Sequence, residues 1–108
     1  TLLAQLTRAP WATPLVKDCK AAVSDAVYDV LVRRGQLKQL NDEVVLLAET
    51  YAEAVQRVRE EIVKSGSITA AQVRDQFATT RKYALALLEH LDAVGVTRRV
   101  GDARTLRE

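Results

Sequence analysis

The chain has 108 residues, 48% of them hydrophobic and 28% charged, a balance that is typical of a globular protein and excludes a disordered one. This length suits one ordinary domain or two very small ones, and no apolar run approaches the roughly 20 residues that a membrane-spanning helix needs. Residues 1–66 contain nine basic and nine acidic residues and have zero net charge. Residues 67–108 contain seven basic and five acidic residues and have a net charge of +2, which is too small to indicate a nucleic-acid binder by itself.

The first half of the chain predicts three short helices and a hairpin. Residues 2–6 predict a helix that "RAPWATP" ends, because two prolines so close together oppose a continuous helix. A second helix is predicted over residues 15–20. Ser24 is a suitable N-cap for a third, which Gly35 ends. "QLKQL" and "EVVLL" then flank Asn41-Asp42, which predicts a hairpin with a two-residue turn.

The second half repeats this order with clearer signals. A helix is predicted from about residue 49 to residue 64, because apolar side chains recur there at helical spacing. Thr69, followed three places later by Gln72, forms a capping-box pattern that starts a short helix. After a polar break, a longer helix runs from Thr80 to Val94. "VTRRV" and "ARTLR" flank Gly101-Asp102 and predict a second hairpin.

The order helix, short helix, turn, longer helix and hairpin indicates a winged helix-turn-helix. It is clear in residues 49–108 and looser in residues 1–48. We therefore expect a mainly α fold with small β-hairpins, arranged as two tandem winged-helix modules.

Catalytic and metal-binding chemistry lacks the residues it needs. Cys19 and His90 are the single cysteine and the single histidine, and no glycine-rich phosphate loop occurs. We interpret Cys19 as a buried apolar residue and His90 as a boundary or surface residue. The chain predicts neither an enzyme nor a metal site nor a cofactor. One cysteine cannot form an internal disulfide, which suits the cytoplasm, and the start without Met or a signal peptide predicts a fragment of a longer protein.

The helix from Thr80 to Val94 carries two cations in its first turn. Arg81 and Lys82 oppose the helix dipole there, at a cost on the order of a few tenths of a kcal/mol, so their placement favours an anion as ligand. Solvated cations without a ligand are the alternative. One face carries the predicted buried stripe (Ala84, Leu87, Leu88 and Leu91), and the opposite face carries Lys82, Ala86, Glu89 and Ala93.

The second hairpin gathers four arginines. With a two-residue turn, Arg99 lies directly across from Arg104, and such like charges destabilise a hairpin by up to roughly 1 kcal/mol unless an anion lies between them. Arg98 and Arg107 then fall on the opposite face, where at least one of them could serve structure alone. Arginine rather than lysine also suits bidentate contact with phosphate or a guanine edge.

These features favour nucleic acid as the partner and leave its type open. Few aromatic residues are present, so a stacking platform for single strands is not expected, and a compact basic patch suits a folded hairpin or a duplex backbone. A DNA-binding regulator is one alternative, although Glu89 and Asp92 make the distal half of the helix acidic, which opposes contact along its whole length. A protein-interaction module is another, since the neutral first module carries the apolar strand "VVLL".

The stretch "TTRKYALALLEHLDAVGVTRRVGDARTLR" resembles the C-terminal winged helix of the bacterial selenocysteine-specific translation elongation factor. The resemblance extends more weakly through "VRRGQLKQLNDEVVLLAETY". It implies the last two modules of that family's row of four winged helices, with a GTPase region upstream and outside this sequence.

By this resemblance, the terminal module binds the selenocysteine insertion hairpin of messenger RNA and so tethers the factor for recoding of a stop codon. It implies phosphate or base contacts by Arg81, Lys82, Arg98, Arg99 and Arg104, with Thr80 adding a hydroxyl and Arg74 a weaker contact. We further expect a monomer that contacts no membrane, with the first module acting as a spacer toward the ribosome.

Overall fold

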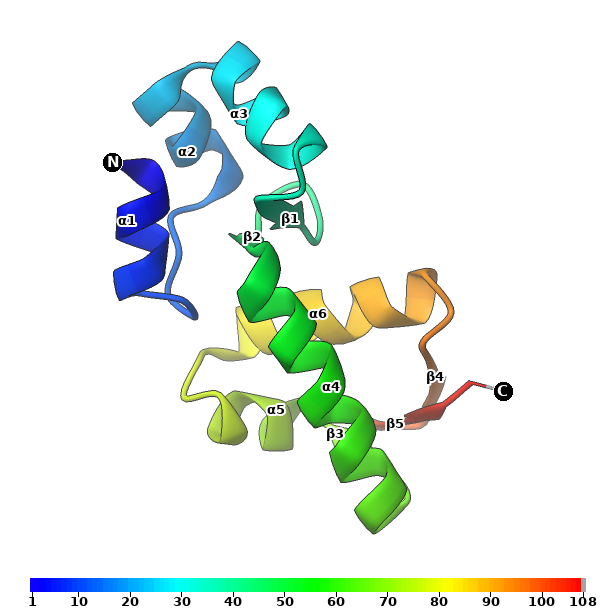
Figure 1. The fold of residues 1–108 in the computed structure, drawn as a ribbon. Coiled ribbons are helices and arrows are strands. Elements are labelled where there is room, and N and C mark those ends of the chain that lie inside the picture. Colours follow the sequence, from blue (N-terminus) through cyan, green and yellow to red (C-terminus); the bar gives the residue numbers. More distant parts are fainter. Residues whose placement is uncertain (108) are drawn as a thin grey trace. The chain divides into compact units, whose positions relative to one another are not determined.

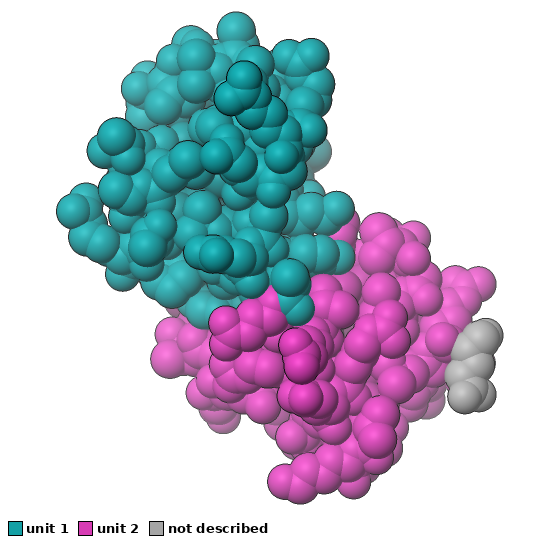
Figure 2. Space-filling model, viewed as in Figure 1, with its two compact units in different colours: residues 1–52 teal, residues 53–108 magenta. Residues whose placement is uncertain are grey.

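The computed structural model describes residues 1–107 and divides into two compact units, Thr1–Ala52 and Glu53–Glu108 (Figures 1 and 2). The division falls inside helix α4 (Ala48–Ser65), whereas the sequence prediction placed the boundary where this helix begins. α4 therefore belongs mostly to the second unit, and its first residues belong to the first.

The first unit contains three helices followed by a two-stranded hairpin. The helices are α1 (Leu2–Arg8), α2 (Val16–Val23) and α3 (Asp25–Arg33), and the strands are β1 (Leu37–Gln39) and β2 (Val45–Leu47) (Figure 1). Ser24 caps α3 as expected, because its Oγ accepts a hydrogen bond from the amide of Val27 at 3.2 Å. Gly35 follows α3 with φ at 75°, a conformation that costs glycine little.

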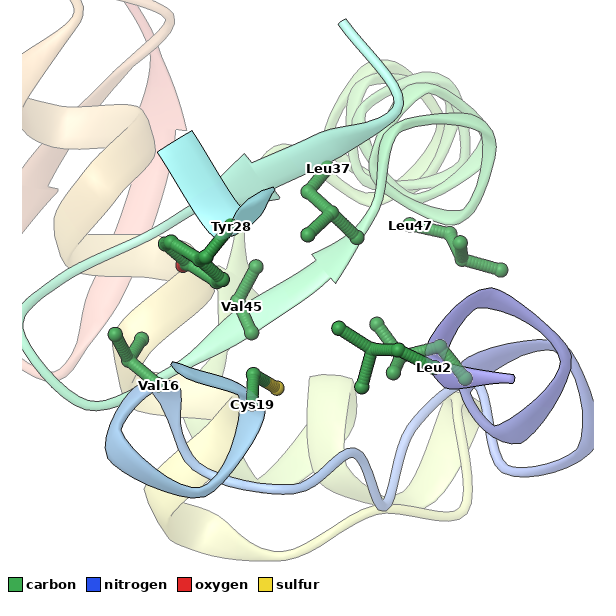
Figure 3. Close-up of a cluster of buried hydrophobic side chains, with 8 residues drawn as sticks. Leu2, Val16, Cys19, Tyr28, Leu37, Val45 and Leu47 are labelled. Atoms are coloured by element: carbon green, nitrogen blue, oxygen red, sulfur yellow. The ribbon is translucent and has the colours of Figure 1, made fainter. Parts of the chain in front are cut away.

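The core of the first unit lies between its helices and its hairpin. Figure 3 shows side chains from α1, α2, α3 and both strands converging on one cluster, which consists of Leu2, Leu6, Val16, Cys19, Tyr28, Leu37, Val45 and Leu47. Tyr28 is 1% exposed, and its hydroxyl donates a hydrogen bond to Oε1 of Gln39 at 2.7 Å, so its polar end is satisfied.

The turn of the first hairpin differs from the two-residue turn that the sequence predicts. Leu40 donates its amide to the carbonyl of Val44 at 2.8 Å, which leaves three residues in the loop. The reason is Asn41, whose Oδ1 accepts from the amides of Glu43 and Val44 at 2.9 and 2.8 Å. This side-chain turn replaces the tight backbone turn and sets the register that places Val45 opposite Gln39.

The second unit has the elements of a winged helix. After α4 come β3 (Ile68–Thr69), α5 (Ala70–Gln76), α6 (Arg81–Ala93), β4 (Thr97–Val100) and β5 (Ala103–Leu106). The strands form an antiparallel sheet in the order β3-β5-β4. The sequence analysis missed β3, because two residues are too few to show a strand's alternation. The predicted fold class, mainly helical with small hairpins, is confirmed.

Helix α6 is covered more extensively than one stripe would be. The four predicted residues, Ala84, Leu87, Leu88 and Leu91, are all fully buried. The prediction that Ala86 lies on an open outer face is wrong, since Ala86 is 3% exposed, and Tyr83 is also largely buried. The exposed cations of α6, Arg81 and Lys82, lie in its first turn, and Glu89 and Ala93 are exposed farther along the helix.

Candidate nucleic-acid interface

Three of the predicted arginines line one pocket of the second unit. Arg81 comes from the first turn of α6, Arg99 from β4 and Arg104 from β5. The pocket has a volume of about 360 Å³, and its other walls come from Thr69, Ala70, Ala71, Leu85 and Asp102. A helix start and a β-hairpin thus contribute cations to the same hollow.

The register of the second hairpin agrees with the prediction. Arg99 pairs with Arg104, and Val100 pairs with Ala103, so Gly101-Asp102 is a two-residue turn. Gly101 has φ at 62°, which suits glycine at the first central position of such a turn. Because side chains alternate along a strand, Arg99 and Arg104 share one face of the hairpin, while Arg98 lies on the other.

Arg104 is not the surface cation that the sequence analysis expected. It is 2% exposed, and its Nε lies 3.1 Å from Oδ2 of Asp92, near the end of α6. The other carboxylate oxygen of Asp92 accepts a hydrogen bond from the hydroxyl of Thr97 at 2.6 Å. The interpretation that an external anion compensates the Arg99–Arg104 pair is therefore wrong for Arg104, because the protein supplies its own carboxylate.

Arg99 and Arg81 are the exposed cations of the pocket. The Nε of Arg99 donates to the carbonyl of Gly101 at 2.9 Å, which ties the guanidinium to the turn of the hairpin. Counted by side chains, the pocket carries three arginines and Asp102, and Asp92 compensates Arg104, so the local net charge is +1. Such a site suits a ligand with one negative charge, such as a phosphodiester.

The other predicted residues do not line this pocket. Lys82 is exposed in the first turn of α6, and Arg98 is exposed on the opposite face of the hairpin. Thr80 is the N-cap residue of α6, but its side chain makes no capping hydrogen bond. Arg74 lies on α5 and contacts Asp75 at 3.0 Å in an exposed ion pair. Contacts of these four residues with RNA stay predictions.

The sequence analysis did not identify the remaining walls of the pocket. Asp102 was read only as a turn residue and Thr69 only as a helix cap, although both line the hollow. Leu85 follows Arg81 by four residues, so helical spacing alone could have placed them on the same side of α6. No local signal could have placed Thr69 beside β5, because their pairing is long-range.

Cys19 and His90 lie outside this pocket. Burial raises the pKa of the Cys19 thiol, with a further contribution from the nearby Asp18 carboxylate, so the thiol is protonated at neutral pH. Among the described residues, no group of three or more potential ligands could hold a metal ion. Over the same residues, the helices are too short or too polar to cross a membrane.

Known proteins are similar to the part of the chain that forms this pocket. Residues 60–106 match the family described as the winged helix of elongation factor SelB. The chain matches the C-terminal winged-helix region of elongation factor SelB. The resemblance predicted from the sequence is thereby confirmed.

Two relatives are similar to most of this chain. The selenocysteine-specific elongation factor of Desulfomicrobium baculatum is 29% identical over 82 residues, which are 76% of this chain and 13% of that protein. The mRNA-binding domain of SelB from E. coli, solved in complex with SECIS RNA, aligns with a TM-score of 0.72 and 25% identity, over 86% of this chain and 82% of that one.

A longer structure shares the fold. The crystal structure of the bacterial selenocysteine-specific elongation factor EF-Sec aligns over 98% of this chain and 18% of its own length, with a TM-score of 0.76 and 18% identity. The chain thus spans a small part of these whole factors.

Proposed function

We propose that the second unit binds the selenocysteine insertion hairpin of messenger RNA and so tethers a selenocysteine-specific elongation factor for recoding of a stop codon. The observation that carries the proposal is the match, at 25% identity and a TM-score of 0.72, to an mRNA-binding domain solved with SECIS RNA. The pocket formed by α6 and the hairpin adds a physical reason, because two exposed arginines there can reach the same stretch of RNA backbone.

The proposal assigns binding, not catalysis, to this chain. The GTPase activity of an elongation factor would belong to other parts of the whole protein, since this chain spans 13% of the relative from D. baculatum. Because the proposed function involves messenger RNA and the ribosome, we expect the factor to work in the cytoplasm. Arg81 and Arg99 are the exposed pocket residues that we expect to contact phosphate.

The test is a titration of the chain with a SECIS-type RNA hairpin and with a duplex that has the same stem and no loop. We expect tighter binding of the hairpin. Equal affinity for both RNAs would defeat the specific function, and tighter binding of double-stranded DNA of matched length would support a DNA-binding regulator instead.

Substitutions then locate the interface. Arg99→Gln removes one phosphate contact, so the slope of log Kd against log salt should fall by about one. Arg59→Gln is the matched control, because Arg59 is an exposed arginine on α4 that does not line the pocket. If both variants changed the slope equally, the interface would not lie at the pocket.

A further inference from the structure

The pair formed by Arg104 and Asp92 joins the binding pocket to the distal end of α6. Arg104 lines the pocket, whereas Asp92 lies about two helical turns beyond Leu85, the last pocket residue on this helix. Asp92 also accepts a hydrogen bond from Thr97 of β4, so one carboxylate holds both strands of the hairpin against α6. Asp92 therefore holds a residue that lines the pocket, although Asp92 itself does not line it.

One nitrogen of the Arg104 side chain is bound within the protein, and its terminal nitrogens are available to a ligand. Its Nε is the nitrogen that contacts Asp92, and among the described residues no acceptor takes a hydrogen bond from its terminal Nη1 and Nη2 groups. The side chain is 3% exposed, so these donors can meet a ligand only through the pocket that Arg104 lines. A guanidinium held in this way presents directed hydrogen-bond donors.

The carboxylate of Asp92 also removes most of the charge that Arg104 would otherwise add to the pocket. An exposed arginine attracts any polyanion, and this attraction depends on salt rather than on shape. A compensated arginine retains its hydrogen bonds, which depend on geometry, but contributes little to long-range attraction.

We propose that Asp92 is a positioning residue of the RNA site, which makes Arg104 a fixed and charge-compensated donor for one phosphate group of the bound RNA. This inference rests on the proposed function. Arg81 and Arg99 supply the attraction for RNA, and Arg104 supplies selectivity for a correctly placed phosphate. The chemical class of the ligand group is a monoanionic phosphodiester, which matches the local charge of +1.

The first test is Asp92→Asn, which keeps a side-chain oxygen for Thr97 and removes the negative charge. We expect the slope of log Kd against log salt to steepen by about one, with several-fold tighter binding of the loopless duplex and a smaller preference for the hairpin. Glu89→Gln is the matched control, because Glu89 is an exposed carboxylate on the same helix, and its loss adds the same charge without freeing Arg104. Equal slopes for the two variants would overturn the proposal.

A second variant separates positioning from mere support of the fold. Thr97→Val removes the 2.6 Å hydrogen bond to Asp92 and leaves every charge in place, so it should leave the salt slope unchanged. If Thr97→Val reproduced the effect of Asp92→Asn, loosening of the hairpin would explain both, and the proposal would be wrong. Circular dichroism at the binding temperature establishes that each variant is folded.

A third variant keeps the proposal testable if Asp92→Asn does not fold. Arg104→Lys retains the charge and loses the terminal pair of donors, so we expect about tenfold weaker hairpin binding at every salt concentration with an unchanged slope. Binding equal to that of the unaltered chain would overturn the proposal. Failure of the unaltered chain to prefer the hairpin over the duplex would instead defeat the proposed function.

Discussion

At the scale of single residues, burial decides what a charged or polar side chain can do. Arg104 is 2% exposed and has its counter-ion, Asp92, in the same unit, whereas Arg99, its partner across the hairpin, is exposed. Two arginines that are directly paired in the sheet therefore serve different purposes. Arg104 is held by a carboxylate of the protein and can meet a ligand only through the pocket, whereas Arg99 is exposed at the surface.

Burial also shifts the titration of a tyrosine. Burial raises the pKa of Tyr28 from 10.0 to about 12, with smaller contributions from Cys19 and Asp29. The folded state disfavours the phenolate. The contribution of the neutral Tyr28 to the free energy of unfolding is therefore fully present below pH 10 and is lost as the pH rises from 10 to about 12. The loss in the free energy of unfolding should reach about 2–3 kcal/mol.

Urea denaturation at pH 9 and at pH 11.5 checks this prediction. The unaltered chain should lose stability between the two values, and Tyr28→Phe should lose clearly less, because phenylalanine cannot ionise. The variant is also less stable at both values, since it lacks the hydrogen bond to Gln39. An equal alkaline loss in both proteins would show that Tyr28 is not the responsible group.

At the scale of elements, a local capping motif starts α5, one of the two helices that line the pocket. Thr69 and Gln72 form a reciprocal capping box: the hydroxyl of Thr69 accepts from the amide of Gln72 at 3.2 Å, and Oε1 of Gln72 accepts from the amide of Thr69 at 2.8 Å. Thr69 also belongs to β3, which pairs with β5. This cap therefore fixes where the sheet ends and α5 begins.

Loss of this cap should lower stability by a measurable amount. Thr69→Ala removes the acceptor for the amide of Gln72 and should reduce the free energy of unfolding by about 1 kcal/mol. Thr69→Ser retains a hydroxyl at the same place and should lose much less. The measurement is urea denaturation of both variants, and similar losses would assign the effect to the β-branched side chain in β3 rather than to the cap.

At the scale of the whole molecule, each unit has its own helices, sheet and buried side chains. The first unit has a contiguous core that spans α1 to β2 (Figure 3). The second carries every residue that lines the candidate RNA pocket. The division inside α4 means that a dissection of the chain must keep this helix intact to preserve the second unit.

A fragment of residues 48–108 tests whether the second unit binds RNA by itself. We expect it to fold and to bind the hairpin within about threefold of the affinity of the full chain, since no pocket residue is removed and three-fold is less than 1 kcal/mol. Circular dichroism and the same titration provide the measurement. A folded fragment that no longer binds would assign an RNA contact to residues 1–47.

Most of the fold could be predicted because its signals are local. The caps at Ser24 and Thr69, the glycine at Gly95 and the buried stripe of α6 each depend on residues within a few positions of one another. The register of the second hairpin was also predicted, since the length of a tight turn fixes which residues face each other. The first hairpin was mispredicted where the side chain of Asn41 competed with the backbone turn.

By itself, the sequence determined the order of the helices and hairpins, the two-residue turn between Arg99 and Arg104, and the resemblance to a winged helix that binds RNA. Only the tertiary structure decided which of these two arginines has a counter-ion from the protein. Strand alternation places Arg99 and Arg104 on one face but does not say which of them another element covers. The carboxylate that pairs with Arg104 comes from α6, and the choice between an external anion and an internal one depends on the distance between elements, which the sequence does not contain.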